Sequence, residues 1–187
     1  MKEGEIVVKN QWDIIEEKIL YDHGIVSFKE QKCYHTKKDV RHDFFKMEFL
    51  DWVNIIPLTL EGELILVKQY RFGTEEVTLE LPGGTLDDGE DTPHLAAERE
   101  LSEETGYKSQ ELLSLGKVAV NPAIQNNYCH FYLAQEAVKE QEQELDNSED
   151  IEVISTSWEE VNELIASGEI NHSLTILGIL YAQKYFR

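Results

Sequence analysis

Residues 81–107 read LPGGTLDDGEDTPHLAAERELSEETGY, and this stretch predicts the end of a strand, a glycine loop and an acidic helix. Glu100, Glu103 and Glu104 recur at spacings of three and four, so they share one helical face. Like charges at these spacings repel and cost helix stability, each pair by about a few tenths of a kcal/mol. Carboxylates gathered in this way indicate a hard cation such as Mg²⁺ or Mn²⁺, which prefers oxygen ligands.

The acidic helix has predicted limits. Pro93 fits its first turn, and Gly106 fits the position just after its last residue, Thr105. A buried side is expected from four apolar residues: Leu95, Ala96, Ala97 and Leu101.

Composition limits the possible partners. The chain has 187 residues and is 41% hydrophobic, which allows one domain with an appendage and an ordinary buried core. Its formal net charge of −20 argues against binding duplex nucleic acid, which requires basic patches. A small phosphate ligand stays possible, because a bound metal can invert the local field.

The sequence also predicts a location. Cys33 and Cys129 form neither a CxxC pair nor a zinc spacing, and the first residues lack the apolar stretch of a secretory signal. We therefore expect a cytoplasmic protein in a reducing compartment. The longest apolar run, residues 174–182, is too short for a membrane span and predicts a buried helix, so no membrane partner is expected.

The N-terminal section reads as antiparallel strands without a helix. Residues 1–50 are expected to form a small β subdomain attached to a catalytic domain over residues 51–187, with a polar loop over 37–41. Its expected strands are 12–21, 25–35 and 44–50. Small sheets have exposed edges, and pairing with a second copy of the chain would protect them.

The rest of the chain mixes strands and helices. A polar, acidic loop is expected over residues 135–150. Strands are expected over 53–60, 63–71, 77–81, 113–120, 128–134 and 151–154. Helices are expected from Ser157, as N-cap, to about 166, and over 173–186. This order predicts an α/β (α+β) protein or a three-layer α/β/α sandwich.

The motif in the opening stretch resembles the Nudix box, which is Gly, five residues, Glu, seven residues, then Arg-Glu-aliphatic-x-Glu-Glu-x-Gly. Gly84 and the run from Arg99 to Gly106 match it. The first half departs by one residue, so that either Glu90 or Asp91 can stand for the first acid. The resemblance implies a Nudix-type α/β/α sandwich with a mixed sheet.

Further stretches resemble the branch of ADP-ribose pyrophosphatases and nucleoside-diphosphate-sugar hydrolases. They are Gln69-Tyr70-Arg71, Glu80-Leu81-Pro82-Gly83-Gly84 and Glu149-Asp150-Ile151. In that branch the N-terminal sheet helps to build a homodimer, so the resemblance implies a homodimer here as well.

The resemblance also implies ligands for Mg²⁺, with Mn²⁺ possible. Glu100 and Glu104 are the expected direct ligands, and a carbonyl of the glycine loop, Gly83 or Gly84, is expected to add another. Further carboxylates that could hold the metal are Glu103 and Glu149. The alternative for the acidic face is an ordinary solvated helix surface. Arg99 is expected to hold the loop through an ion pair with Glu90 or Asp91.

The catalytic residues implied are Glu103, Glu104 and Glu149. Either Glu149 or Glu103 would serve as the general base, with Asp146 as the nearest competitor of Glu149. Three candidates for substrate contacts are Arg71, Glu80 and Asn127, the last in a polar loop over 121–127. An Arg fork can bind two phosphate oxygens, although an ion pair between neighbouring strands would explain Arg71 and Glu80 as well.

These expectations describe a Mg²⁺-dependent hydrolase of a small nucleoside diphosphate derivative. It would cleave ADP-ribose or a nucleotide sugar such as GDP-mannose to a nucleoside monophosphate and a sugar phosphate. One alternative is a Nudix enzyme for nucleoside triphosphates or dinucleotides. Another is a non-catalytic ligand-binding Nudix module, which would typically lack the acids of the box.

Overall fold

The computed structural model describes residues 11–87 and 92–185, so Glu90 and Asp91 lie outside the described residues. The described chain forms two compact units. The first contains residues 11–49 together with 121–126, and the second contains the remaining described residues. The loop 121–126 therefore belongs with a part of the sequence that ends more than seventy residues earlier.

The first unit is a three-stranded antiparallel sheet. Its strands β1 (Trp12–Asp22), β2 (Ser27–His35) and β3 (Val40–Glu48) are paired in that order. The loop expected over 37–41 is shorter than predicted, because residues 40 and 41 already pair with β2. The loop 121–126 is attached through Met47 N–H, which donates to Ile124 O at 2.7 Å, and Phe49 N–H, which donates to Asn126 Oδ1 at 2.8 Å.

The second unit is built on a mixed sheet. Its strands are β4 (Trp52–Thr59), β5 (Leu64–Arg71), β6 (Glu76–Glu80), β7 (Tyr107–Lys108), β8 (Glu111–Ala119), β9 (Tyr128–Lys139) and β10 (Ile151–Thr156). The order is β10-β5-β4-β9-β7, with β6 paired to β5 and β8 paired to β9. β4 and β9 are parallel, and the other pairs are antiparallel.

β9 corrects one prediction. The polar run expected as a loop over 135–150 begins with five strand residues, 135–139. They are ordered by pairing: Gln135 faces Glu111 of β8, and Lys139 faces Tyr107 of β7. Polar residues are acceptable there because the exposed side of a strand can be solvated. The loop is therefore confined to residues 140–150.

In the described part of the chain three α-helices accompany the sheet: α1 (Pro93–Thr105), α2 (Trp158–Ser167) and α3 (Ser173–Ala182). A short 3₁₀ turn, η1 (Gln183–Tyr185), follows α3. The predicted caps are confirmed, since Ser157 Oγ accepts from Glu160 N–H and Gly106 is left-handed at φ 73°. The predicted burial of Leu95 is wrong, because 49% of it is exposed. Glu100 and Glu104 are buried on α1 instead.

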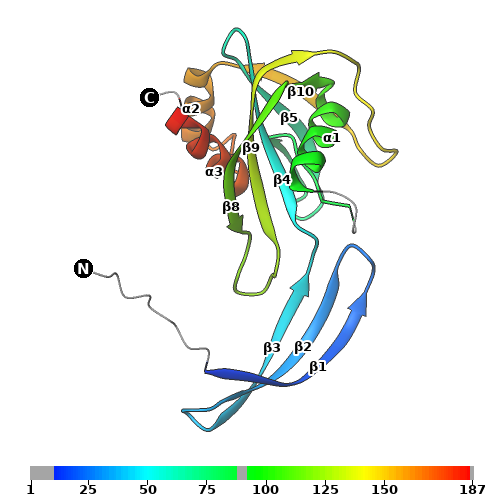
Figure 1. Cartoon of the computed structure of the whole chain (residues 1–187), viewed down its shortest axis with the longest axis vertical. Coiled ribbons are helices and arrows are strands. Elements are labelled where there is room, and N and C mark those ends of the chain that lie inside the picture. The colour runs from blue at the N-terminus through cyan, green and yellow to red at the C-terminus, as the bar shows by residue number, and fades with distance from the viewer. Residues whose placement is uncertain (1–10, 88–91, 186–187) are drawn as a thin grey trace, which may run out of the picture. The chain divides into compact units, whose positions relative to one another are not determined.

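The helices lie on both faces of the sheet, as Figure 1 shows for α1 on one side and α2 and α3 on the other. Successive residues of β4 point to opposite faces: Ile55 packs with Ala97 and Leu101 of α1, and Ile56 packs with the cluster that includes Ile179 of α3. Two apolar cores separated by one sheet define the α/β/α sandwich that the sequence predicts.

The packing of α3 is close. A Cβ added to Gly178 would come within 2.6 Å of Leu81 Cδ1, so glycine lets the helix approach the strand end that leads into the glycine loop. None of the helices in the described ranges is both long and apolar enough to cross a membrane.

Candidate active site

The glycine loop is fastened to β4 by backbone hydrogen bonds. Val53 N–H donates to Gly84 O and Ile55 N–H donates to Pro82 O, both at 2.9 Å. The carbonyls on either side of Gly83 are thus used in pairing with β4. This arrangement favours the Gly83 carbonyl over that of Gly84 as the backbone ligand of a metal.

Both glycines permit close contacts that a side chain would prevent. A Cβ on Gly83 would lie 2.1 Å from Val53 O, and a Cβ on Gly84 would lie 2.2 Å from Glu100 Oε1. Contacts this short do not occur between real atoms. The Glu100 carboxylate therefore lies directly against the backbone of the loop, in space that only glycine leaves open.

The two acids of the box that face this loop are almost out of water. Glu100 is 8% exposed and Glu104 is 4% exposed, and Gly83 N–H donates to Glu104 Oε2 at 2.8 Å. Burial raises the pKa of Glu100 to about 7 and that of Glu104 to about 8. The neighbouring carboxylates add to both shifts, whereas Arg99 opposes the first and the Gly83 N–H opposes the second.

Arg99 joins the acids to the loop. Its Nη1 donates to Glu100 Oε1 at 2.9 Å and to Glu103 Oε2 at 3.0 Å, and its Nη2 donates to Thr85 O at 3.2 Å. Asp87 Oδ2 lies 3.8 Å from Arg99 Nε. The structural role expected for Arg99 agrees with these contacts, while the pairing predicted with Glu90 or Asp91 concerns residues outside the described ranges.

Glu149 reaches the same place from the loop that follows β9. Its side chain is exposed, and its charge acts on both Glu100 and Glu104, so it lies near the buried pair. Its Oε2 accepts from Asp146 N–H at 3.0 Å. Glu103, by comparison, is partly exposed and held by Arg99.

This donor set fits a hard divalent cation. Two buried carboxylates with raised pKa values, Glu100 and Glu104, lie beside the backbone of the glycine loop and feel the charge of Glu149, and a cation would relieve their mutual repulsion. In residues 11–87 and 92–185 no three acidic, His or Cys side chains converge as a complete cage. Mg²⁺ does not require one, because it usually takes one or two carboxylates and completes its shell with water and phosphate oxygens.

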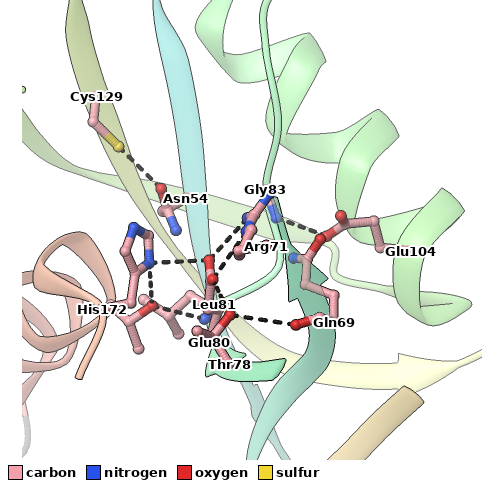
Figure 2. A network of polar contacts seen from close by, with 11 residues as sticks. Asn54, Gln69, Arg71, Thr78, Glu80, Leu81, Gly83, Glu104, Cys129 and His172 are labelled. Atoms are coloured by element: carbon pink, nitrogen blue, oxygen red, sulfur yellow. Dashed lines mark hydrogen bonds and ion pairs between the residues drawn. The ribbon is translucent and has the colours of Figure 1, made fainter. Parts of the chain in front are cut away.

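A second network lies beside this site. Arg71 of β5 donates from Nε and Nη2 to the two oxygens of Glu80 of β6, at 2.9 and 2.8 Å. Thr78 Oγ1 donates to the same carboxylate, and His172 Nδ1 lies 3.0 Å from its Oε2. Figure 2 shows Arg71 between Glu80 and the contact of Gly83 with Glu104.

Glu80 is charged despite being only 1% exposed. Burial acts to raise the pKa of Glu80, but the hydrogen bonds from Arg71, His172 and Thr78 outweigh it and hold the pKa well below its usual range. Arg71 keeps 45% of its side chain exposed, and its charge acts on Glu104. The buried partner therefore orients a guanidinium whose outer side remains accessible.

Arg71 also borders a cavity of about 440 Å³. The residues that line it include Thr78, Glu80, Asn171, His172 and Ser173. Hydroxyl, amide and imidazole groups of this kind suit the hydroxyl groups of a sugar.

Asn127 is placed differently from the other expected substrate contacts. It is 1% exposed, and neither side-chain amide atom has a hydrogen-bond partner among the described residues. A buried amide without partners is costly, which makes this residue unusual. Its expected contact with substrate stays a prediction.

The sequence profile of the NUDIX domain matches residues 50–176. The chain belongs to the Nudix family. The matched range begins just before β4, the strand that pairs with the glycine loop, and ends within α3. It therefore covers the whole carboxylate site and the sheet that supports it.

Relatives of this Nudix chain include enzymes and an enzyme activator. It is 36% identical over 132 residues to an ADP-ribose pyrophosphatase of Bacillus subtilis, covering 70% of this chain and 71% of that protein. It is 34% identical, with the same coverages, to a methanol dehydrogenase activator of Bacillus methanolicus. A crystal structure of an ADP compounds hydrolase shares the fold, with a TM-score of 0.82 over 94% of each chain at 21% identity. With its box acids intact, this Nudix chain is a hydrolase.

Two polar residues of the Nudix site were not expected. The sequence predicts no site role for His172 and places Gln143 in a polar loop, yet His172 contacts Glu80 and Gln143 contacts the end of α1. No sequence pattern marks either one. The sequence offers only a weak hint of a role for Gln143, which is a polar residue in the same predicted loop as Glu149.

The buried acids of the Nudix box predict a pH-dependent stability. Between the ordinary Glu pKa of 4.5 and the raised value of about 8, folded Glu104 holds more protons than the unfolded chain does. The free energy of unfolding should therefore fall as pH rises through this window in a chelator. Glu104→Gln removes the buried charge and keeps an acceptor for Gly83 N–H, so at pH 8 it should gain at least about 1 kcal/mol, or about 2–4 °C in Tm.

Thermal unfolding in EDTA at pH 5 and pH 8 measures this difference. The gain should largely vanish at pH 5, where the parent carboxyl is already protonated. Glu111→Gln, at an exposed position of β8, is the control and should show no such pH dependence. A gain of equal size at both pH values would contradict the burial argument.

Proposed function

We propose that this protein hydrolyses the diphosphate of ADP-ribose or of a nucleoside-diphosphate sugar, releasing a nucleoside monophosphate and a sugar phosphate. The observation that carries the proposal is the buried pair Glu100 and Glu104 against the glycine loop, with the charges of Arg71 and Glu149 acting on Glu104. The names of the relatives, ADP-ribose pyrophosphatase and ADP-sugar pyrophosphatase among them, support this substrate class.

Mg²⁺ is the proposed cofactor, and Mn²⁺ would meet the same ligands. Glu100, Glu104 and the Gly83 carbonyl would hold it, with Glu103 and Glu149 as further carboxylates within the acidic cluster. When bound, the cation would neutralise the charge of the diphosphate and the charge that develops at phosphorus.

Glu149 is the proposed general base. It is exposed and lies near the buried pair, whereas Glu103 is occupied by Arg99. Glu149 would take a proton from a water molecule as the water oxygen bonds to one phosphorus. The bond from that phosphorus to the bridging oxygen breaks in line, and the bridging oxygen leaves with the other phosphate.

Arg71 is the proposed substrate contact, and Glu80 is proposed to hold it. Because both Glu80 oxygens are engaged by Arg71, Thr78 and His172, a direct contact of Glu80 with substrate would first have to break these bonds. The accessible guanidinium can bind a phosphate oxygen, and the adjoining cavity can hold the sugar. Asn127 remains a proposed contact on the strength of its unpartnered amide.

A homodimer formed through the first unit is also proposed. Its sheet exposes apolar side chains on β1 and β3, including Ile14, Ile19 and Phe45, each at least half exposed. Apolar surface of this kind marks an interaction site, and an unpaired edge strand is protected by pairing with another copy.

We place the protein in the cytoplasm. Cys33 and Cys129 are both unpaired and buried, which suits a reducing compartment.

The substrate class can be tested with ADP-ribose, nucleotide sugars and nucleoside triphosphates in Mg²⁺. A coupled phosphatase releases phosphate from the monoester products but not from intact ADP-ribose, so phosphate reports cleavage. Triphosphates, which the phosphatase attacks itself, are followed by chromatography of the monophosphate. We expect cleavage of the diphosphates, and a fall in turnover of about 100-fold or more for Glu104→Gln, since the charged ligand is lost.

Glu111→Gln should keep full turnover. Cleavage of triphosphates alone would point to another branch of the family, and failure on every compound would favour a binding module. Unchanged turnover in Glu104→Gln would remove the assignment of this acid.

The role of Arg71 predicts a binding defect. Arg71→Lys keeps the charge but loses the two-pronged contact with Glu80, so the ammonium is no longer directed at the substrate. We expect KM to rise about tenfold, with a smaller change in kcat, in steady-state kinetics. Lys68→Arg, at an exposed position of the same strand, is the control and should leave KM unchanged. Normal KM in Arg71→Lys would mean that the ion pair serves only the fold.

The dimer can be tested by light scattering at micromolar concentration. We expect twice the mass of one chain for the parent. Ile14→Glu combined with Ile19→Glu should give a monomer, because each places a charge on the exposed apolar strand. Leu60→Glu, at an exposed turn of the second unit, should remain dimeric. A monomeric parent would end this proposal.

A further inference from the structure

The end of α1 is closed by the segment that follows β9. The last carbonyls of a helix have no partner within the helix and must find one elsewhere. Glu103 O accepts from Glu144 N–H at 2.9 Å, and Glu104 O accepts from Gln143 Nε2 at 2.7 Å. Two of the acids of the site, Glu103 and Glu104, thus have their backbone carbonyls capped by this segment.

The contact between this segment and the helix end is close. Gly106 O accepts from the backbone N–H groups of Glu140 and Gln141, at 2.9 and 3.2 Å. A Cβ on Gly106 would lie 2.1 Å from Gln141 O, so glycine is needed for the approach as well as for its left-handed φ of 73°. The beginning of the loop is therefore fixed to the helix by several bonds.

Gln143 also fixes the other end of the loop. The same Nε2 donates to Ile151 O at 3.0 Å. Ile151 is the first residue of β10, where it pairs with Gln69 of β5. One side-chain amide thereby connects the acidic turn of α1, the start of the loop and the strand at its end.

Glu149 lies inside the loop that this amide closes, two residues before Ile151. A short turn forms within this loop. Glu149 N–H donates to Asp146 O at 3.0 Å, and Asp146 N–H donates to Glu149 Oε2 at 3.0 Å. These bonds are internal to the loop and would move with it. The contacts that set where Glu149 stands relative to Glu104 are those of Gln143 and its neighbours.

We propose that Gln143 is a positioning residue for the hydrolysis, because its amide holds the Glu149 loop at a set place beside the Glu100 and Glu104 carboxylates. The inference rests on the proposed role of Glu149 as general base, and it names the residue that keeps Glu149 in position for that role. Gln143 itself has no contact with the reacting atoms in this account. Its effect on catalysis should therefore pass through Glu149.

The test is a double-mutant cycle. Gln143→Met keeps the length of the side chain and removes both donated bonds, so kcat should fall roughly 10- to 100-fold, as expected for a misplaced catalytic group. In a Glu149→Gln background the same substitution should lower kcat by less than about twofold. KM should stay close to the parent value. Gln135→Met, at an exposed position of β9, is the matched control.

Two further measurements keep the proposal independent of activity and of folding defects. Hydrogen exchange of the amides in residues 144–150 should quicken in Gln143→Met and stay unchanged in Gln135→Met. Gln143→Lys keeps N–H donors at the end of the side chain, so its kcat should be much closer to the parent value than that of Gln143→Met. If Gln143→Met does not fold, Gln143→Asn is used instead. Its side chain is shorter by one methylene, so the amide no longer reaches Glu104 O and Ile151 O.

The outcomes separate the two proposals. No hydrolysis by the parent chain would contradict the proposed function, and the exchange data would still decide the role of Gln143 in holding the loop. An equal fall of kcat in both backgrounds, or unchanged exchange in residues 144–150, would overturn the positioning role.

Discussion

The bond from Gly83 N–H to the Glu104 carboxylate is the contact on which the site depends. It joins the glycine loop to α1, and it opposes the rise that burial causes in the pKa of Glu104. The loop in turn is held by β4, and the helix packs on the face of β4 to which Ile55 points. Strand, loop and helix thus support one another around a carboxylate that costs stability until a cation compensates it.

The two charged networks of the site differ in how their buried carboxylates are compensated. Around Glu80, three donors surround a buried carboxylate, so that its charge is satisfied within the protein and Arg71 is oriented. Around Glu100 and Glu104 the described residues provide one hydrogen-bond donor each, from Arg99 and from Gly83 N–H. The negative charge of Glu80 is therefore neutralised within the protein. The acids Glu100 and Glu104 lack such compensation, and a bound cation would stabilise them, as is typical of a binding site.

Local patterns were enough to predict most of the elements. The limits of α1, its capping glycine and the shared face of Glu100 and Glu104 follow from residue types and spacing. The extension of β9 was missed because its order comes from pairing with β7 and β8, which are distant in the sequence or very short. His172 and Gln143 were missed for the same reason: each acts through a contact made only when separate strands and helices meet.

The loop 121–126 has a consequence for how such a chain could arise. Because this loop sits with the N-terminal sheet, the polypeptide passes between the two units three times. Cutting the gene at codon 50 would remove the donors at Met47 and Phe49 and leave Ile124 O and Asn126 Oδ1 without their partners. The N-terminal sheet is therefore not a transferable module, and its acquisition or loss would have to be accompanied by changes in the hairpin between β8 and β9.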